Sequence, residues 1–121
     1  MPTGLLVLEF PSTDSLSFEV LNDYWHWIMA PYHLFHFNRK SMRFLLESKG
    51  FHVLGWEASE VNWMWAESIA NSSGFLNNYL NKWRCDSDFV EYSMEVDKCF
   101  DFIANGLGKQ SVLQVYACLV E

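Results

Sequence analysis

The predicted fold rests first on an apolar run at residues 4–11, GLLVLEFP, in a chain of 121 residues. Within this run only Glu9 carries a polar side chain. Such a run is typical of a strand that is buried on both faces, as strands are in parallel sheets. Pro11 ends the predicted strand because proline has no N–H to donate to a neighbouring strand.

A helix is expected after this strand, from about Ser15 to Pro31. The polar residues directly before it can cap its first turn, and apolar residues recur along it at helical spacing. Pro31 stops the helix, because its ring and its missing N–H do not fit a helix interior. Residues 31–37, PYHLFHF, are then predicted to form a connecting loop with a mostly apolar lining.

A second helix and a second strand complete a predicted βαβ unit. Asn38 is the predicted N-cap of this helix, and Gly50 stands where a left-handed residue usually ends one. The second strand is expected over residues 51–56. Because two strands joined through a long helical connection normally pair in parallel, the strands at residues 4–10 and 51–56 should be parallel neighbours.

Residues 57–105 are predicted to form a helical insertion. Its helices are expected near residues 60–70, 75–83 and 88–105. Asp88, with Glu91 three residues later, resembles a capping box at the start of the third of these helices. Residues 111–120 are almost wholly apolar and form the last predicted strand.

Composition and charge exclude two classes of partner. The net charge is −7 and the eight basic residues are scattered, whereas nucleic-acid binding relies on clustered Lys and Arg. No apolar stretch is long enough to span a bilayer, and none resembles a signal peptide. Three cysteines without a Cys-x-x-Cys pair are typical of buried thiols in a reducing compartment. We therefore expect a cytoplasmic protein that binds neither nucleic acid nor membranes.

The region from His33 to Val53 carries a longer pattern, HxxxFNxxSMxxLLxxxGFxV. This pattern resembles a signature of class I S-adenosylmethionine-dependent methyltransferases, above all the branch with ubiquinone-biosynthesis-type and sugar C-methyltransferase-like enzymes. Residues 4–11 are similar to that family's fifth strand, and residues 108–117 to its final strand. The resemblance implies an α/β chain of one partial domain over residues 1–121. Its fold would be the C-terminal half of a Rossmann-like methyltransferase sheet, with a parallel βαβ unit, a final antiparallel strand and the helical insertion.

The cofactor-binding half of such a methyltransferase is missing from the sequence. The resembled family binds S-adenosylmethionine on its first four strands, with a Gly-rich turn after the first. The nearest glycine pair, Gly106 and Gly108, follows a helix and precedes a strand, the reverse of what a cofactor-binding turn needs. The resemblance therefore implies S-adenosylmethionine binding only if the missing N-terminal half is supplied. No residue is assigned to cofactor binding, and the isolated chain is expected to be inactive.

His33 is the candidate catalytic residue. In the resembled family its loop faces the substrate, where a neutral imidazole serves as general base. Tyr32 and His36 in the same loop, and Trp25 before it, are candidate substrate contacts. The alternative is that His33 is structural and hydrogen-bonds the backbone. His33 and His36 alone do not make a zinc site, because no further ligand pair has the required spacing, and no metal ligand is assigned.

Two further features have both a functional and a structural interpretation. Glu9, at the carboxyl end of the first predicted strand, either contacts a ligand or is a solvated or cap-bonded carboxylate. A set of tryptophans fits a lid over a substrate, a protein interface or plain core packing. These are Trp25, Trp27, Trp63 and Trp65.

The sequence leaves two functions open. The first is a fragment or subunit of an S-adenosylmethionine-dependent methyltransferase that contributes substrate-side and structural elements. The second is a non-catalytic interaction module that forms a homodimer or binds a partner along the strand from Gly4 to Phe10. An unpaired apolar strand edge is a template for another strand, which is the basis of the second interpretation. A binder of a small apolar ligand is a third possibility that rests on Trp content alone.

Overall fold

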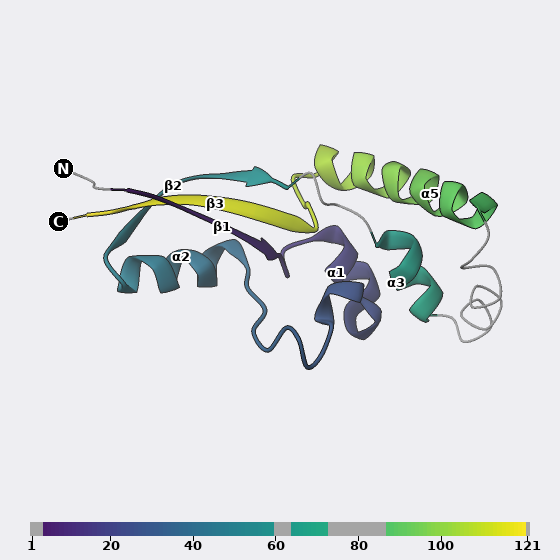
Figure 1. Cartoon of the computed structure of the whole chain (residues 1–121), viewed down its shortest axis with the longest axis horizontal. Coiled ribbons are helices and arrows are strands. Elements are labelled where there is room, and N and C mark those ends of the chain that lie inside the picture. The colour runs from purple at the N-terminus through teal and green to yellow at the C-terminus, as the bar shows by residue number, and fades with distance from the viewer. Residues whose placement is uncertain (1–3, 60–63, 73–86, 121) are drawn as a thin grey trace.

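The computed structural model describes residues 4–59, 64–72 and 87–120. They form a three-stranded sheet with one helix, α2, lying below it, while the other helices gather beyond one end of the sheet (Figure 1). The strands are β1 (Leu5–Pro11), β2 (Phe51–Ala58) and β3 (Val112–Leu119). The helices are α1 (Leu16–Leu21), α2 (Arg39–Ser48), α3 (Trp65–Ser72) and α5 (Ser87–Gly106).

The last strand, β3, lies in the centre of the sheet and runs antiparallel to both neighbours, in the order β1-β3-β2. Val115 of β3 lies opposite Leu8 of β1 on one side and Trp56 of β2 on the other. The predicted parallel βαβ unit is therefore wrong, because β1 and β2 do not pair with each other. The Rossmann-like sheet that the resemblance implied is corrected to a fully antiparallel one.

Burial explains why β3 takes the central position. Leu113, Val115 and Ala117 of β3 are at most 1% exposed, whereas Leu5 and Val7 of β1 are 62% and 46% exposed. A strand with neighbours on both sides removes the most apolar surface from water, so the most apolar strand gains most from the centre. An apolar run indicates that a strand forms but not which strand it pairs with, and β1 was therefore wrongly expected to be buried on both faces.

Helix α2 is confirmed, with Asn38 as its N-cap. Asn38 Oδ1 accepts a hydrogen bond from the Ser41 N–H at 2.7 Å, and Ser41 Oγ accepts one from the Asn38 N–H at 3.0 Å. Gly50 follows the helix in the left-handed conformation, with φ of +82°, as expected for a residue at that position. Local interactions therefore fix both ends of α2.

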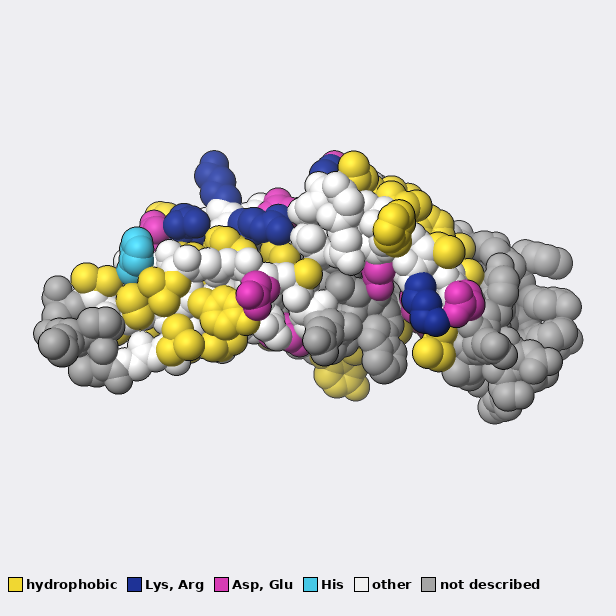
Figure 2. Space-filling view, turned by 90° about the horizontal axis from the view of Figure 1, so that it is seen from above, with side chains coloured by type: hydrophobic (Ala, Val, Ile, Leu, Met, Phe, Trp, Pro, Cys, Tyr) yellow, Lys and Arg dark blue, Asp and Glu magenta, His cyan; other side chains and the backbone are white. Residues whose placement is uncertain are grey.

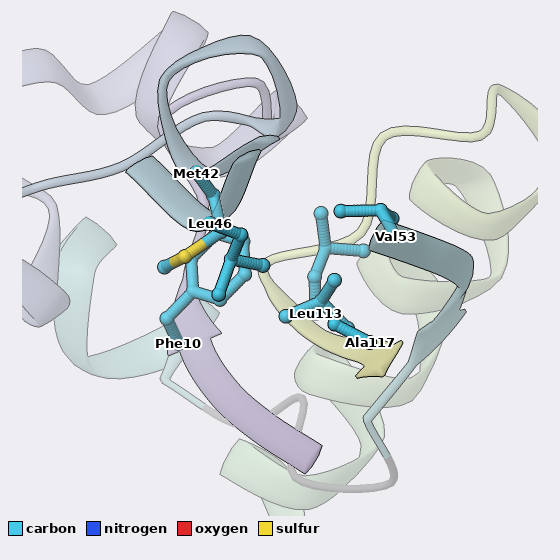
Figure 3. Packing of buried hydrophobic residues seen from close by; sticks show 7 residues of the cluster. Phe10, Met42, Leu46, Val53, Leu113 and Ala117 are labelled. Atoms are coloured by element: carbon cyan, nitrogen blue, oxygen red, sulfur yellow. The ribbon is translucent and has the colours of Figure 1, made fainter. Parts of the chain in front are cut away.

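The main hydrophobic core lies between α2 and the sheet (Figure 3). Met42 and Leu46 come from α2, and the other residues come from all three strands. The buried cluster consists of Phe10, Met42, Leu46, Val53, Leu113, Val115 and Ala117. Each fully buried side chain of this size contributes about 1.5–3 kcal/mol to folding, so this core holds α2 on one face of the sheet.

The first helix is shorter than predicted. Ser15 caps α1 by accepting a hydrogen bond from the Phe18 N–H at 3.2 Å, but the helix ends at Leu21. Asn22 has a φ of +45°, and the chain continues in two 3-10 turns, Asn22–Tyr24 and His26–Ile28. The expected helix as far as Pro31 is therefore wrong in its second half. Apolar spacing did not distinguish helix from tight turns, and Asn adopts a positive φ, as at the end of α1, more readily than most residues.

A second core joins α1, α3 and α5. The rings of Trp65 and Phe100 stack with centroids 4.7 Å apart, and Leu21 and Ala104 are buried in the same cluster. Of the three helices predicted for the insertion, the first corresponds to α3 and the third to α5. The second, expected near residues 75–83, lies outside the described residues, as does Trp63. Asp88 lies within α5 instead of before it, so the expected capping position is wrong.

Within the described ranges, no helix combines the length and hydropathy that crossing a bilayer requires.

Candidate functional site

The loop that follows the second 3-10 turn holds His33 in a defined orientation. His33 Nδ1 lies 2.7 Å from the backbone oxygen of Trp27, and the His33 N–H donates to the backbone oxygen of Met29 at 3.3 Å. Because a carbonyl oxygen only accepts, Nδ1 must carry the hydrogen of this bond. In neutral His33 the lone pair is therefore on Nε2, which is the atom that could accept a proton. The structural alternative, a hydrogen bond from His33 to the backbone, is therefore confirmed, and a catalytic role of Nε2 stays a prediction.

Aromatic rings surround His33 on two sides. The ring of Trp27 stacks on it with centroids 6.2 Å apart and an angle of 13° between the planes. His36 lies 6.4 Å from His33, and Trp25 lies 6.3 Å from His36. The structure therefore brings together three of the predicted site residues, His33, His36 and Trp25, and adds Trp27 to them.

Two indole N–H groups in this cluster have no acceptor among the described residues. They belong to Trp25, which is only 2% exposed, and to Trp27. A buried donor without an acceptor is uncommon in proteins. We name His33, His36, Trp25 and Trp27 the loop cluster.

Tyr32 does not contribute to the loop cluster. Its side chain is 82% exposed, and the neighbouring Leu34 and Phe35 are exposed as well. Among the described residues, no hydrogen bond or ring contact orients the Tyr32 side chain. The structure therefore gives no support to Tyr32 as a preformed substrate contact.

Glu9 lies in a second cluster, on the sheet face opposite α2. Its Oε2 accepts hydrogen bonds from Gln114 Nε2 at 2.8 Å and from Ser59 Oγ at 2.7 Å. These two hydrogen bonds, that of Gln114 first, lower the pKa of Glu9 below its usual value, so the carboxylate is ionised at neutral pH. Glu9 has no described contact with His33. The two residues were predicted to belong to one substrate site, but they lie in two separate clusters.

Tyr116 and Glu57 extend this second cluster across the sheet. The Tyr116 hydroxyl donates to Glu57 Oε2 at 2.8 Å and lies 3.0 Å from Gln114 Oε1. The hydrogen bond to Glu57 raises the pKa of Tyr116 above its ordinary value. In the register, Gln114 lies between Glu9 on β1 and Glu57 on β2. Sequence analysis missed these partners because they meet only through the strand order, which it did not predict.

The described residues show no metal-ligand group and assign Trp25 and Trp65 to the core. No three His, Cys, Asp or Glu side chains within residues 4–59, 64–72 and 87–120 converge as metal ligands. Trp65 is buried against Phe100, and Trp25 is 2% exposed in the same buried cluster, so core packing is confirmed for both tryptophans.

Comparison of the chain with protein-family models, with curated proteins and with solved structures gives no match. The function must therefore be inferred from the arrangement of the residues themselves.

Proposed function

We propose that this chain is an interaction module that pairs the outer edge of β1 with a strand of a second copy or of another protein. The hydrogen-bond pattern between β1 and β3 supports this proposal, because it determines which backbone groups of β1 point away from the sheet. The Ser12 N–H donates to the Ser111 oxygen at 2.8 Å, and residues two apart in an antiparallel strand point their backbone groups to the same side. The backbone N–H and C=O groups of Leu6, Leu8 and Phe10 therefore point toward β3. Those of the residues between them point away from the sheet.

The outward groups belong to Leu5, Val7 and Glu9. No described strand pairs with them, whereas the chain beyond the strand is already covered, because the Thr13 N–H donates to the Phe37 oxygen at 2.9 Å. Exposed edge strands are usually protected by Lys, by a bulge or by Pro within the strand. Here Pro11 stands only at the end of β1, and Glu9 is the one charged residue within it. The outward backbone groups of three alternate residues, Leu5, Val7 and Glu9, are thus available to another strand.

Native mass spectrometry at micromolar concentration tests the pairing. We expect an assembly larger than the monomer for the unmodified chain and for Val7→Thr, which keeps the N–H and the branched side chain. Val7→Pro should give the monomer, because it removes an outward donor without touching the ladder to β3. Circular dichroism should show that Val7→Pro remains folded. An unmodified chain that is monomeric under these conditions contradicts the proposal.

A second candidate function is a substrate-side component of a methyltransferase. The observation that favours it is the geometry of His33, whose Nδ1–H is held by the Trp27 oxygen while Nε2 remains available as a base. In this function His33 would take a proton from the methyl acceptor. His36, which is exposed beside His33, would contact the acceptor's oxygen atoms.

The described residues do not fit S-adenosylmethionine by themselves. A cofactor turn needs glycine directly after a strand, where the backbone approaches the ligand. Of the described glycines, the two with positive φ are Gly50 and Gly108, and both precede strands. The cofactor would have to bind to a second polypeptide segment.

Isothermal calorimetry tests the methyltransferase function. A cofactor-binding half of a class I methyltransferase should bind S-adenosylmethionine and gain transfer activity when this chain is added. His33→Gln should then leave cofactor binding unchanged and lower turnover by about 100-fold, the usual contribution of a general base. A mixture that binds no S-adenosylmethionine contradicts this second function and leaves the pairing proposal intact.

A further inference from the structure

The sheet has a second face that no described element covers. Side chains alternate across β1, so Leu6, Leu8 and Phe10 face α2, whereas Leu5 and Val7 face the other side. In the view from above, from the side opposite α2, hydrophobic side chains gather over the half of the molecule that holds the strands (Figure 2). A sheet with apolar side chains on both faces normally has a layer on each of them.

The strand register places the side chains of this open face in rows. One row consists of Leu5, Cys118 and His52, and the next contains Val7 and Tyr116 beside the bulge between Val53 and Gly55. Leu54, the bulged residue, is exposed. Directly opposed side chains on neighbouring strands lie about 5 Å apart, so the apolar members of these rows form one continuous surface.

A third row is acidic and lies next to the helical end of the sheet. It consists of Glu9, Gln114 and Glu57. Both carboxylates are exposed, and their described partners are neutral donors, namely Ser59, Gln114 and Tyr116. No described Lys or Arg forms an ion pair with either of them. The open face therefore combines an apolar area with an anionic border.

We propose that this open face is the docking site of an amphipathic helix from a partner protein, with Leu-like side chains over Val7 and Leu5 and a Lys or Arg at one end facing Glu9 and Glu57. The apolar rows determine the hydrophobic stripe of the helix, and the acidic row determines the sign of its charged end. The docking extends the proposed function. When a strand of another chain pairs with β1, the sheet becomes wider, and so does the open face on which a helix can pack.

Charge argues against a second copy of this chain as the occupant. The chain carries a net charge of −7, and two open faces packed together would bring four carboxylates near one another. Like charges opposed across an interface suppress association. A cationic helix, in contrast, turns both carboxylates into ion pairs with a partner.

Cys118 provides a probe for docking because it lies within the open face. Cys99 on α5 is exposed, so the expectation of a buried thiol is wrong there, and it serves as the internal control. We would add synthetic amphipathic helical peptides of identical Leu-containing stripe, one with Lys at the charged end and one with Glu, and measure iodoacetamide labelling of each thiol by peptide mass mapping. The Lys peptide should slow labelling of Cys118 but not of Cys99, and the Glu peptide should leave both unchanged.

The double variant Glu9→Gln/Glu57→Gln tests the role of the acidic row. It keeps the hydrogen-bonding shape of both side chains and should weaken binding of the Lys peptide about tenfold, with most of the salt dependence lost. Glu47→Gln on α2 is the matched control and should bind as the unmodified chain does. Equal protection by both peptides, or protection by neither, overturns the proposal. Because the peptides add no strand, these results are independent of whether β1 pairs in native mass spectrometry.

Discussion

Asp97 of α5 accepts a hydrogen bond from the N–H of Ala66 of α3 at 2.8 Å. Its other oxygen accepts from the N–H of Met64, just before α3, at 3.1 Å. The first turn of α3 is therefore capped by a side chain from another helix, far away in the sequence. This relationship ties the position of α3 to that of α5.

Asp97→Ala should destabilise the protein by about 1 kcal/mol, because it leaves the N–H of Met64 before α3 and the N–H of Ala66 in its first turn without an acceptor. Urea unfolding followed by tryptophan fluorescence measures this change. Glu95→Ala, which removes an exposed carboxylate of the same helix that pairs with Lys98, is the control and should change stability by less than about 0.5 kcal/mol. Equal effects of the two substitutions would show that Asp97 does not act as a cap.

Asp101 should make stability depend on pH. Burial raises its pKa to about 6 from a value of 3.8, with the nearby Asp97 adding to the shift and the hydrogen bond from Trp65 Nε1 opposing it. The folded protein then holds this proton more tightly than the unfolded chain does. The contribution of Asp101 to the free energy of unfolding is therefore full at low pH and is lost as the pH rises from about 4 to about 6. Above that pH it does not change further.

Asp101→Asn should remove this slope, because the amide oxygen still accepts from Trp65 but does not ionise. Unfolding midpoints at pH 4, 5, 6 and 7 measure the effect, and the variant should be the more stable protein at pH 7. The gain should stay well below the roughly 1.4 kcal/mol per pKa unit of a fully buried group, because Asp101 is partly solvated. A variant with the slope of the unmodified chain would assign the pH dependence to another group.

Gly50 should not tolerate a side chain. Its φ of +82° is a conformation that costs L-residues about 1–2 kcal/mol, so Gly50→Ala should lower stability by that amount. Gly55→Ala is the matched control, since Gly55 has no positive φ and no atom lies within 4 Å of an added Cβ. Thermal unfolding distinguishes the two, and equal stability of both variants would contradict the left-handed ending of α2.

Leu46→Ala should cost about 2–5 kcal/mol, because it opens a cavity between α2 and the sheet. Leu45→Ala, one position along the same helix but exposed, should cost much less. Guanidinium unfolding of both variants provides the comparison. Similar losses would mean that α2 packs on the sheet through a different face.

Local patterns predicted the elements, and distant contacts decided their arrangement. Helix α2 was predictable because Asn38 and Gly50 fix its ends through neighbours in the sequence. The strand order was not, because β1 and β3 are both apolar runs and only burial of the complete sheet selects the centre. The association of His33 with His36 followed from their sequence proximity, whereas the partners of Glu9 depend on the register and were missed.

The central position of β3 has a consequence for how the chain acquires its structure. β1 and β2 each form their ladder with β3 and not with each other, although both precede it in the sequence. During synthesis on the ribosome neither of them has a pairing strand until residues 112–119 have emerged. Such late, long-range pairing makes folding slow, and a nascent chain with two unpaired apolar strands is a natural client for chaperones.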